Sequence, residues 1–252
     1  MAHPTVAVLE RHLTLYKRLW RASLFSSFVL PVLFLASIGL GVGGYVGEVG
    51  GVPYVEWIVP GVLASTAFQM AVGECTYAVF GEFRWNRGAH AMFATRVSVW
   101  DMVGGWLLYI VFRVEIAVVV FVLVVGAFGA LSSPWVVLTP LVAALLAVAV
   151  AAPVTAFSAT IDHDSYFALL FRFVMLPSTL FAGVFFPVEQ LPALVRPVAY
   201  VSPLWHGVEL ARAATSGVAP PWPLWAHAGC SVAFAAGGLW WAGYAFRKRL
   251  QD

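Results

Sequence analysis

The stretch WVVLTPLVAALLAVAVAAPVTAFSATI, residues 135–161, contains no charged residue. The hydrocarbon core of a bilayer is about 30 Å thick, and about 20 helical residues are enough to cross it. An uninterrupted apolar run of this length therefore predicts a transmembrane helix. Strands of a membrane barrel would instead show short segments in which apolar and polar residues alternate, and this run has no such alternation.

The composition of the whole chain agrees with a membrane protein. Of the 252 residues, 62% are hydrophobic and 10% are charged, and the mean hydropathy is +0.88. A soluble domain is about half apolar and about a quarter charged, so this chain needs contact with lipid. A net charge of +2 provides no excess of basic groups for phosphate contacts, which excludes a nucleic-acid-binding protein. Cys75 and Cys230 lie in apolar runs and are expected to be buried side chains.

Five more stretches are long and apolar enough to cross a bilayer. The chain is therefore predicted to be an all-α integral membrane protein with six transmembrane helices, a single domain over residues 1–252. The expected spans are about residues 24–43, 57–80, 102–128, 135–161, 166–186 and 223–246.

The basic residues outside these spans lie mostly on one side of the membrane. Only Arg196 and Arg212 are on the opposite side. The positive-inside rule therefore predicts that both termini are cytoplasmic, as an even number of spans requires. Ten basic residues contribute to this bias: Arg11, Lys17, Arg18, Arg21, Arg84, Arg87, Arg96, Arg247, Lys248 and Arg249.

Residues 1–23 show the pattern of an amphipathic helix. Apolar side chains recur at steps of three and four residues, and the charged residues gather on the opposite face. Such a helix is expected to lie in the headgroup plane and to anchor the first span. The apolar positions are Val6, Leu9, Leu13, Tyr16 and Trp20.

Residues 81–102 form the only sizeable segment between spans on the cytoplasmic side. A short helix is expected there, with Trp85, Ala89, Met92 and Phe93 on one face and arginines beside it. Two interpretations remain open. The segment is either a docking element for a cytoplasmic partner or an amphipathic loop whose arginines contact anionic lipid.

The longest connection, residues 187–223, lies on the external side and is too apolar for a solvated loop. Prolines interrupt it, so two short helices that dip into the outer leaflet are expected rather than one span. Ser202 and Pro203 have the residue types of a helix N-cap and first helical position, and this helix is expected to end near Gly217.

Four ionisable residues fall inside the predicted spans. Glu74 and Arg172 each lie six residues from the cytoplasmic end of their span, about 9 Å deep, and could form a pair. Arg113 is about 18 Å deep, and Glu115 points to the other side of the same helix. These charges are either structural pairs between helices or groups that line a substrate or water path.

The sequence offers little for chemistry within this chain. It has no glycine-rich loop of the GxxxxGK[ST] type, so it is not expected to bind nucleotide phosphates. No catalytic residues and no metal site are predicted. The run Asp162-His163-Asp164 points its side chains in different directions and is expected to be a solvated turn.

Residues 180–213, LFAGVFFPVEQLPALVRPVAYVSPLWHGVELARA, resemble the signature of the ABC-2 type transporter permeases. The matching positions are Gly183, Phe186, Pro187, Leu191, Pro192, Pro203, Leu204, His206 and Arg212. Residues 39–64, 77–85 and 162–171 are similar to the branch that exports nodulation factors, lipo-oligosaccharides and drugs, so the resemblance covers almost the whole chain. Trp205, where threonine is common, and the acidic turn at 162–164 depart from the pattern.

The resemblance implies one half of an exporter in the bacterial plasma (inner) membrane. The half would pair with a second permease protomer, identical or not, and sit on two copies of a cytoplasmic ABC ATPase, which would bind ATP and Mg²⁺. Residues 1–23 would be an interface helix, 187–217 external re-entrant helices and 81–99 a coupling helix. The implied coupling residues are Glu82, Phe83, Arg84, Trp85, Arg87, Met92, Phe93 and Arg96. The implied cargo is amphipathic or lipid-linked: a lipo-oligosaccharide, a glycolipid or a hydrophobic drug.

Two alternatives come from other classes of protein. An autonomous ion-coupled transporter could use Glu74, Arg113 and Glu115 as a proton relay. An integral-membrane enzyme that acts on lipids would need polar residues clustered at one interface, and this chain lacks such a cluster.

Overall fold

A computed structural model describes residues 3–24, 47–49, 51–127, 131 and 133–251, with isolated positions (29, 32–33, 36–37, 41 and 45) between them. The first predicted span, residues 24–43, lies almost wholly outside this part of the chain.

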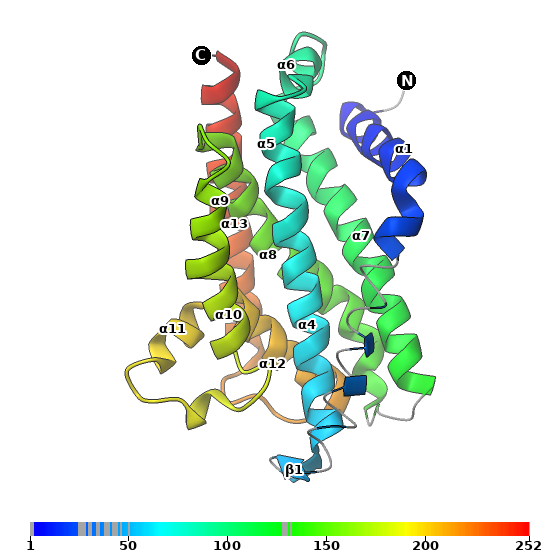
Figure 1. Ribbon diagram of the computed structural model, residues 1–252, viewed down its shortest axis with the longest axis vertical. Helices are drawn as coiled ribbons and strands as arrows, with labels where there is room; N and C mark the ends of the chain where they lie inside the picture. Colours follow the sequence, from blue (N-terminus) through cyan, green and yellow to red (C-terminus); the bar gives the residue numbers. More distant parts are fainter. Residues whose placement is uncertain are drawn as a thin grey trace.

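The described part is predominantly helical (Figure 1). A two-stranded antiparallel hairpin precedes α4 and pairs Glu48 with Pro53 and Val49 with Val52. The elements in chain order are α1 (Pro4–Leu24), β1 (Glu48–Val49), β2 (Val52–Pro53), α4 (Tyr54–Cys75), α5 (Tyr77–Arg84), α6 (Gly88–Phe93), α7 (Val99–Ala127), η2 (Pro134–Leu138), α8 (Thr139–Thr160), α9 (Tyr166–Leu170), the π-helical turn η3 (Phe171–Met175), α10 (Leu176–Phe181), η4 (Val188–Gln190), α11 (Arg196–Val201), α12 (Pro203–Ser216) and α13 (Leu224–Gln251).

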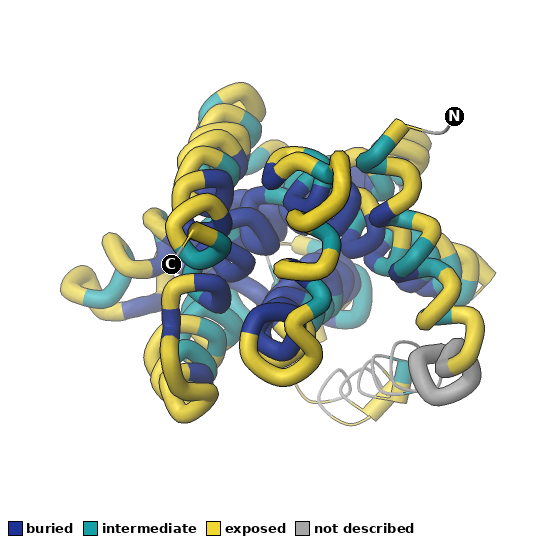
Figure 2. Tube along the Cα trace, turned by 90° about the horizontal axis from the view of Figure 1, so that it is seen from above, coloured by how far each residue is buried: buried dark blue, intermediate teal, exposed yellow. Residues whose placement is uncertain are grey.

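Among the described residues, three helical stretches are long and apolar enough to cross a membrane: Tyr54–Arg84, Val99–Ala127 and Pro134–Thr160. They correspond to the second, third and fourth predicted spans. Together with α13 they form the bundle, in which α8 packs along α13 and also contacts α4 and α7. Viewed along the bundle, the buried residues lie in its interior and exposed residues cover the outside (Figure 2).

Both chain ends and α6 lie at one end of the bundle, called here the terminal end (Figure 1). The hairpin, α11 and α12 lie at the opposite end, called here the far end. This arrangement brings α1, α5, α6 and the end of α13 into the same region of the molecule.

The fifth predicted span, 166–186, is shorter than expected. Its helical part, Tyr166–Phe181, has 16 residues and includes the π-helical turn. The helix ends because Ala182 leaves helical geometry and Gly183 has φ +74. A left-handed φ is free of strain only for glycine, so the chain turns at Gly183 and the helix does not continue to residue 186.

Helix α1 packs along α7, and Leu9, Leu13 and Tyr16 of the predicted apolar face lie partly buried against the core. Val8 and His12 are buried, at 3% and 4% exposure, whereas Val6 is 40% exposed. His12 lies against Trp106, with ring centroids 4.2 Å apart. Close approach is possible because residue 105 is glycine: a Cβ there would lie 2.7 Å from the Val8 side chain. The buried face is thus rotated toward His12, which an apolar pattern cannot reveal.

Candidate functional site

At the terminal end, the segment from α5 to α7 presents one inner and one outer side. Glu82 and Phe83 are buried, at 8% and 4% exposure. Arg11 of α1 donates two hydrogen bonds to the Glu82 carboxylate, at 2.8 and 3.0 Å. The Phe83 ring packs edge-on against Phe246 of α13, 4.8 Å between centroids. These two predicted coupling residues therefore fix the segment to α1 and α13.

The outer side carries exposed aromatic and basic groups. Trp85 is 58% exposed and Phe93 is 40% exposed, and Arg84, Arg87 and Arg96 are exposed as well. The expectation of one helical face from Trp85 to Phe93 is wrong. Arg87 has a left-handed φ of 50 and separates α5 from α6, and Ala89 of α6 is buried. Met92 is half-buried against the core.

Asp162 links three helices at the terminal end, a role that the sequence reasoning missed. Its carboxylate accepts hydrogen bonds from Arg84 of α5 and from Arg249 of α13, the latter at 2.9 Å. Arg249 also donates to the Ile161 carbonyl at 3.2 Å. The hydrogen bond from Arg249, with the nearby guanidinium charges, lowers the pKa of Asp162. Within the described residues, no cluster of three or more His, Cys, Asp or Glu could hold a metal ion.

Inside the bundle, Glu74 of α4 pairs with Arg113 of α7. The expected pair between Glu74 and Arg172 is therefore wrong: Arg172 is exposed on the π-helical turn. The Arg113 guanidinium also lies over the Tyr16 ring of α1, 5.0 Å from its centroid. The sequence predicted different depths for Arg113 and Glu74, and the long Arg113 side chain can reach across such a difference. Within the described part of the chain, one carboxylate oxygen of Glu115 is buried without a hydrogen-bond partner.

At the far end, Arg212 of α12 joins the two halves of the 183–212 motif. Its side chain is 3% exposed, pairs with Glu209 and donates to the Gly183 carbonyl at 2.9 Å. The guanidinium also stacks on Trp57 of α4, 3.8 Å from the ring centroid. The turn at Gly183, helix α12 and helix α4 are thereby held at one point.

The other residues of the predicted motif lie in the chain segments around Arg212. His206 contacts the Tyr200 carbonyl through Nε2 and His227 through Nδ1, both at 3.0 Å. Helix α12 begins at Pro203, and Gly217 with φ +68 follows its end. Between Gly183 and α12, the chain turns through Phe186, Pro187, Leu191 and Pro192, of which Leu191 is buried.

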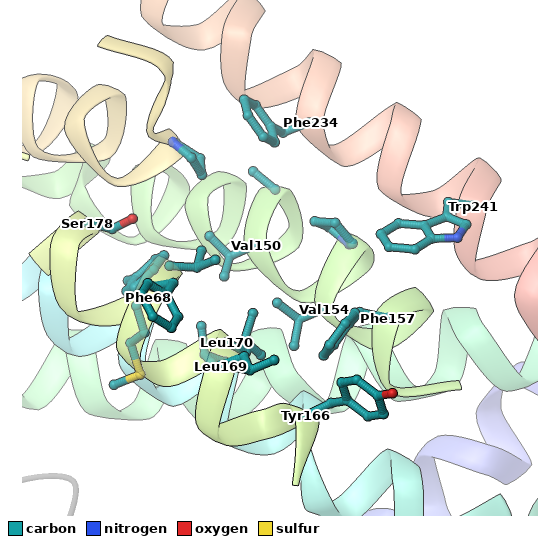
Figure 3. A pocket seen from close by; sticks show the side chains of 17 residues that line it. Phe68, Val150, Val154, Phe157, Tyr166, Leu169, Leu170, Ser178, Phe234 and Trp241 are labelled. Carbon is teal, nitrogen blue, oxygen red and sulfur yellow. The ribbon is translucent and has the colours of Figure 1, made fainter. Parts of the chain in front are cut away.

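An apolar cavity of about 480 Å³ lies between α4, α8, α13 and the α9–α10 segment (Figure 3). Phe68, Val150 and Val154 point into it from α4 and α8, and Phe234 and Trp241 from α13. None of the described residues that line it is charged.

The sequence was compared with protein families and with known proteins, and the matches are membrane transport proteins. The model of the family described as "ABC-2 type transporter" matches residues 4–215. Nodulation protein J of Sinorhizobium fredii is 30% identical over 83% of this chain and 80% of that protein. Nodulation protein J of Rhizobium leguminosarum bv. trifolii is 30% identical over 82% of this chain and 79% of its own length. The inner membrane transport permease YadH of Escherichia coli is 25% identical over 75% and 73%. The chain is thus a member of the ABC-2 type transporter family, a membrane component of transport systems.

Proposed function

We propose that this chain is the permease subunit of an ATP-driven ABC exporter that moves amphipathic or lipid-linked cargo out of the cell. The observation that carries the proposal is the family match over residues 4–215, on a chain with three helical stretches able to cross a membrane. The chain itself would not hydrolyse ATP. The nucleotide and Mg²⁺ would bind to a partner ATPase.

We propose six membrane spans with both termini in the cytoplasm. Residues 24–43, the α9–α10 segment and α13 would add three spans to the three apolar stretches. The terminal end would face the cytoplasm, where the excess of basic residues agrees with the positive-inside rule. Both termini lie at that end of the described bundle, which supports an even number of spans.

The exposed side of the α5–α6 segment is the proposed docking surface for the ATPase. Trp85 and Phe93 offer large apolar area beside arginines, the residue types that dominate binding energy at protein interfaces. Buried Glu82 and Phe83 would not touch the partner. They would transmit its movement to α1 and α13 through the contacts with Arg11 and Phe246.

The cargo class is proposed from the resemblance to exporters of lipo-oligosaccharides and drugs. A proton relay through Glu74 and Arg113 has less support than export of such cargo, because these two side chains neutralise each other as an ion pair.

The test is purification of the tagged chain from its native membranes in mild detergent, with an ATPase assay on the eluate. We expect a cassette ATPase to remain bound and to hydrolyse ATP. The variant W85A/F93A should lose the ATPase and keep membrane insertion, since truncation of an interface anchor costs about 2 kcal/mol or more.

The matched control is W240A, which truncates a 72% exposed tryptophan on α13, outside the docking surface. It should retain the ATPase. Recovery of the wild-type chain alone, under conditions that keep a known exporter intact, would instead favour an autonomous transporter or a lipid enzyme.

A further inference from the structure

The α9–α10 segment is held against neighbouring helices at both of its ends. At its start, the buried Phe167 packs against Tyr77 of α5 and Phe157 of α8, with ring centroids 4.7 and 6.4 Å apart, and at its other end α10 contacts α11 and α12. The 480 Å³ cavity occupies the intervening space, and a second cavity of about 250 Å³ adjoins it toward the far end. The two share five lining residues: Phe173, Val174, Ser178, Pro203 and Phe234. They therefore form one continuous groove, called here the α10 groove.

The lining of the α10 groove suits hydrocarbon and not water. Leu169 and Leu170 face Val150, Val154 and Phe157 across it (Figure 3). A buried water needs two to four polar partners, and this surface offers few. Left empty, the groove would deprive the inner face of the α9–α10 segment of dispersion contacts.

The dimensions favour a narrow chain over a protein segment. A helix 10–12 Å across and about 18 Å long occupies roughly 1,400–2,000 Å³. The two cavities are smaller, about 480 and 250 Å³, and the larger one falls within the roughly 300–1,000 Å³ of small-molecule sites. From Tyr166 to Ser178 the segment rises about 18 Å, close to the roughly 15 Å thickness of one leaflet of the hydrocarbon core. That length matches one acyl chain lying along the helix.

The groove is open along its outer side. Leu169 and Val174 are each 51% exposed and Phe173 is 72% exposed, although all three line the groove. Arg172 is exposed on the same turn and forms no ion pair within the described part of the chain. It lies about 9 Å from Tyr166, so its side chain can extend to the headgroup level and meet a phosphate.

We infer that the α10 groove holds one acyl chain of a membrane phospholipid, whose phosphate is bound by Arg172. This lipid is a bound structural component and not the exported cargo, so the inference goes beyond the proposed function. It fills the space between the α9–α10 segment and the bundle. A resident lipid at this place would fix the position of the segment that leads into the Gly183 turn.

The experiment is native mass spectrometry of the purified full chain, in its complex where one is recovered, after stepwise removal of lipid by detergent. The wild-type chain is expected to keep one phospholipid per copy when other lipids are lost. S178F places an aromatic ring at the junction of the two cavities, and its occupancy should fall about tenfold or more, equivalent to about 1.4 kcal/mol. L180F is the matched control, because Leu180 is exposed on the same helix and lines neither cavity.

Two further arms test the position and the headgroup contact. A phospholipid with a photoreactive group in its acyl chain should label the wild-type chain at Phe173 or Phe234. This arm uses only the wild-type chain, so it does not depend on whether S178F folds. R172Q should reduce the preference for phosphatidylglycerol over phosphatidylcholine. The inference is overturned by a wild-type chain without retained phospholipid, by equal occupancy in S178F, or by labelling elsewhere. It is also overturned if the retained mass is a cargo molecule, or if S178F changes only the oligomeric state.

Discussion

Removal of the Arg212 side chain is expected to destabilise the protein strongly. The substitution R212M keeps much of the length of the side chain and removes its charge. It leaves the Glu209 carboxylate, 7% exposed, without its partner and leaves the Gly183 carbonyl without its donor. Breaking a buried ion pair on one side costs about 3–5 kcal/mol, and loss of the stacking on Trp57 adds about 1 kcal/mol.

The lower end of the summed range is a loss of about 4 kcal/mol for R212M, and we take this value as the expected minimum. For a chain of this size that corresponds to a fall in Tm of roughly 8–16 °C. The assay is thermal unfolding of the purified chain in one detergent, followed by tryptophan fluorescence. The double variant R212M/E209L should recover most of the loss, because an apolar pair of similar volume leaves no buried charge.

The control is R196M, in the connection between α10 and α12. Arg196 donates to the carbonyls of Leu191 and Glu189 at 2.9 and 2.7 Å, but no buried carboxylate depends on it. Its loss should cost about 1 kcal/mol. A Tm of R212M within about 3 °C of wild type, or a double variant as unstable as R212M, would refute the account of Arg212 as the partner that makes a buried carboxylate tolerable.

Three other predictions concern α1 and the bundle interior. G105L should separate α1 from α7, because its Cβ would lie 2.7 Å from Val8, and limited proteolysis should then cut within α1. Acidification should loosen the same contact: burial and then Arg11 lower the pKa of His12 from 6.5 to about 4. The contact of α1 with α7 therefore has its full stability above pH 6.5, where His12 is neutral, and loses up to roughly 3 kcal/mol as the pH falls toward 4. The variant H12F should remove this pH dependence of proteolysis. In a thermal-unfolding cycle, R113L should be less stable than R113L/E74L, and additive effects would contradict the pair.

Three helical stretches of the bundle were predictable because their apolar length is enough to indicate them. Spans at residues 102–128 and 135–161 were predicted because these apolar runs are long enough to cross a bilayer. The structure has α7 at Val99–Ala127 and a helical stretch at Pro134–Thr160. The early end of the fifth segment was harder to foresee. Gly183 stood in the expected motif, but only its positive φ shows that the helix has already ended.

Pairings between helices could not be predicted from one sequence. The depth of Glu74 was estimated from its own helix, and its partner depended on how α7 lies beside α4. Asp162 is the same kind of case. Three adjacent polar residues look like a solvated turn until the ends of α5 and α13 are placed next to it. Position along a helix is local information, whereas the identity of an ion-pair partner is set by packing.

The ion pairs at the two ends of the bundle differ in their exposure to solvent. At the terminal end the Asp162 carboxylate is 63% exposed, and pairs in contact with water contribute about 0–1 kcal/mol each, so they rearrange at little cost. At the far end the Arg212–Glu209 pair is buried, and opening it would cost several kcal/mol. A movement that begins at the α5–α6 segment can therefore shift α1 and α13 while the Gly183 turn, α12 and Trp57 stay together. The exposed pairs of Asp162 leave the terminal end, where an ATPase would dock, free to rearrange. The buried Arg212–Glu209 pair keeps the far end, through which cargo would leave, rigid.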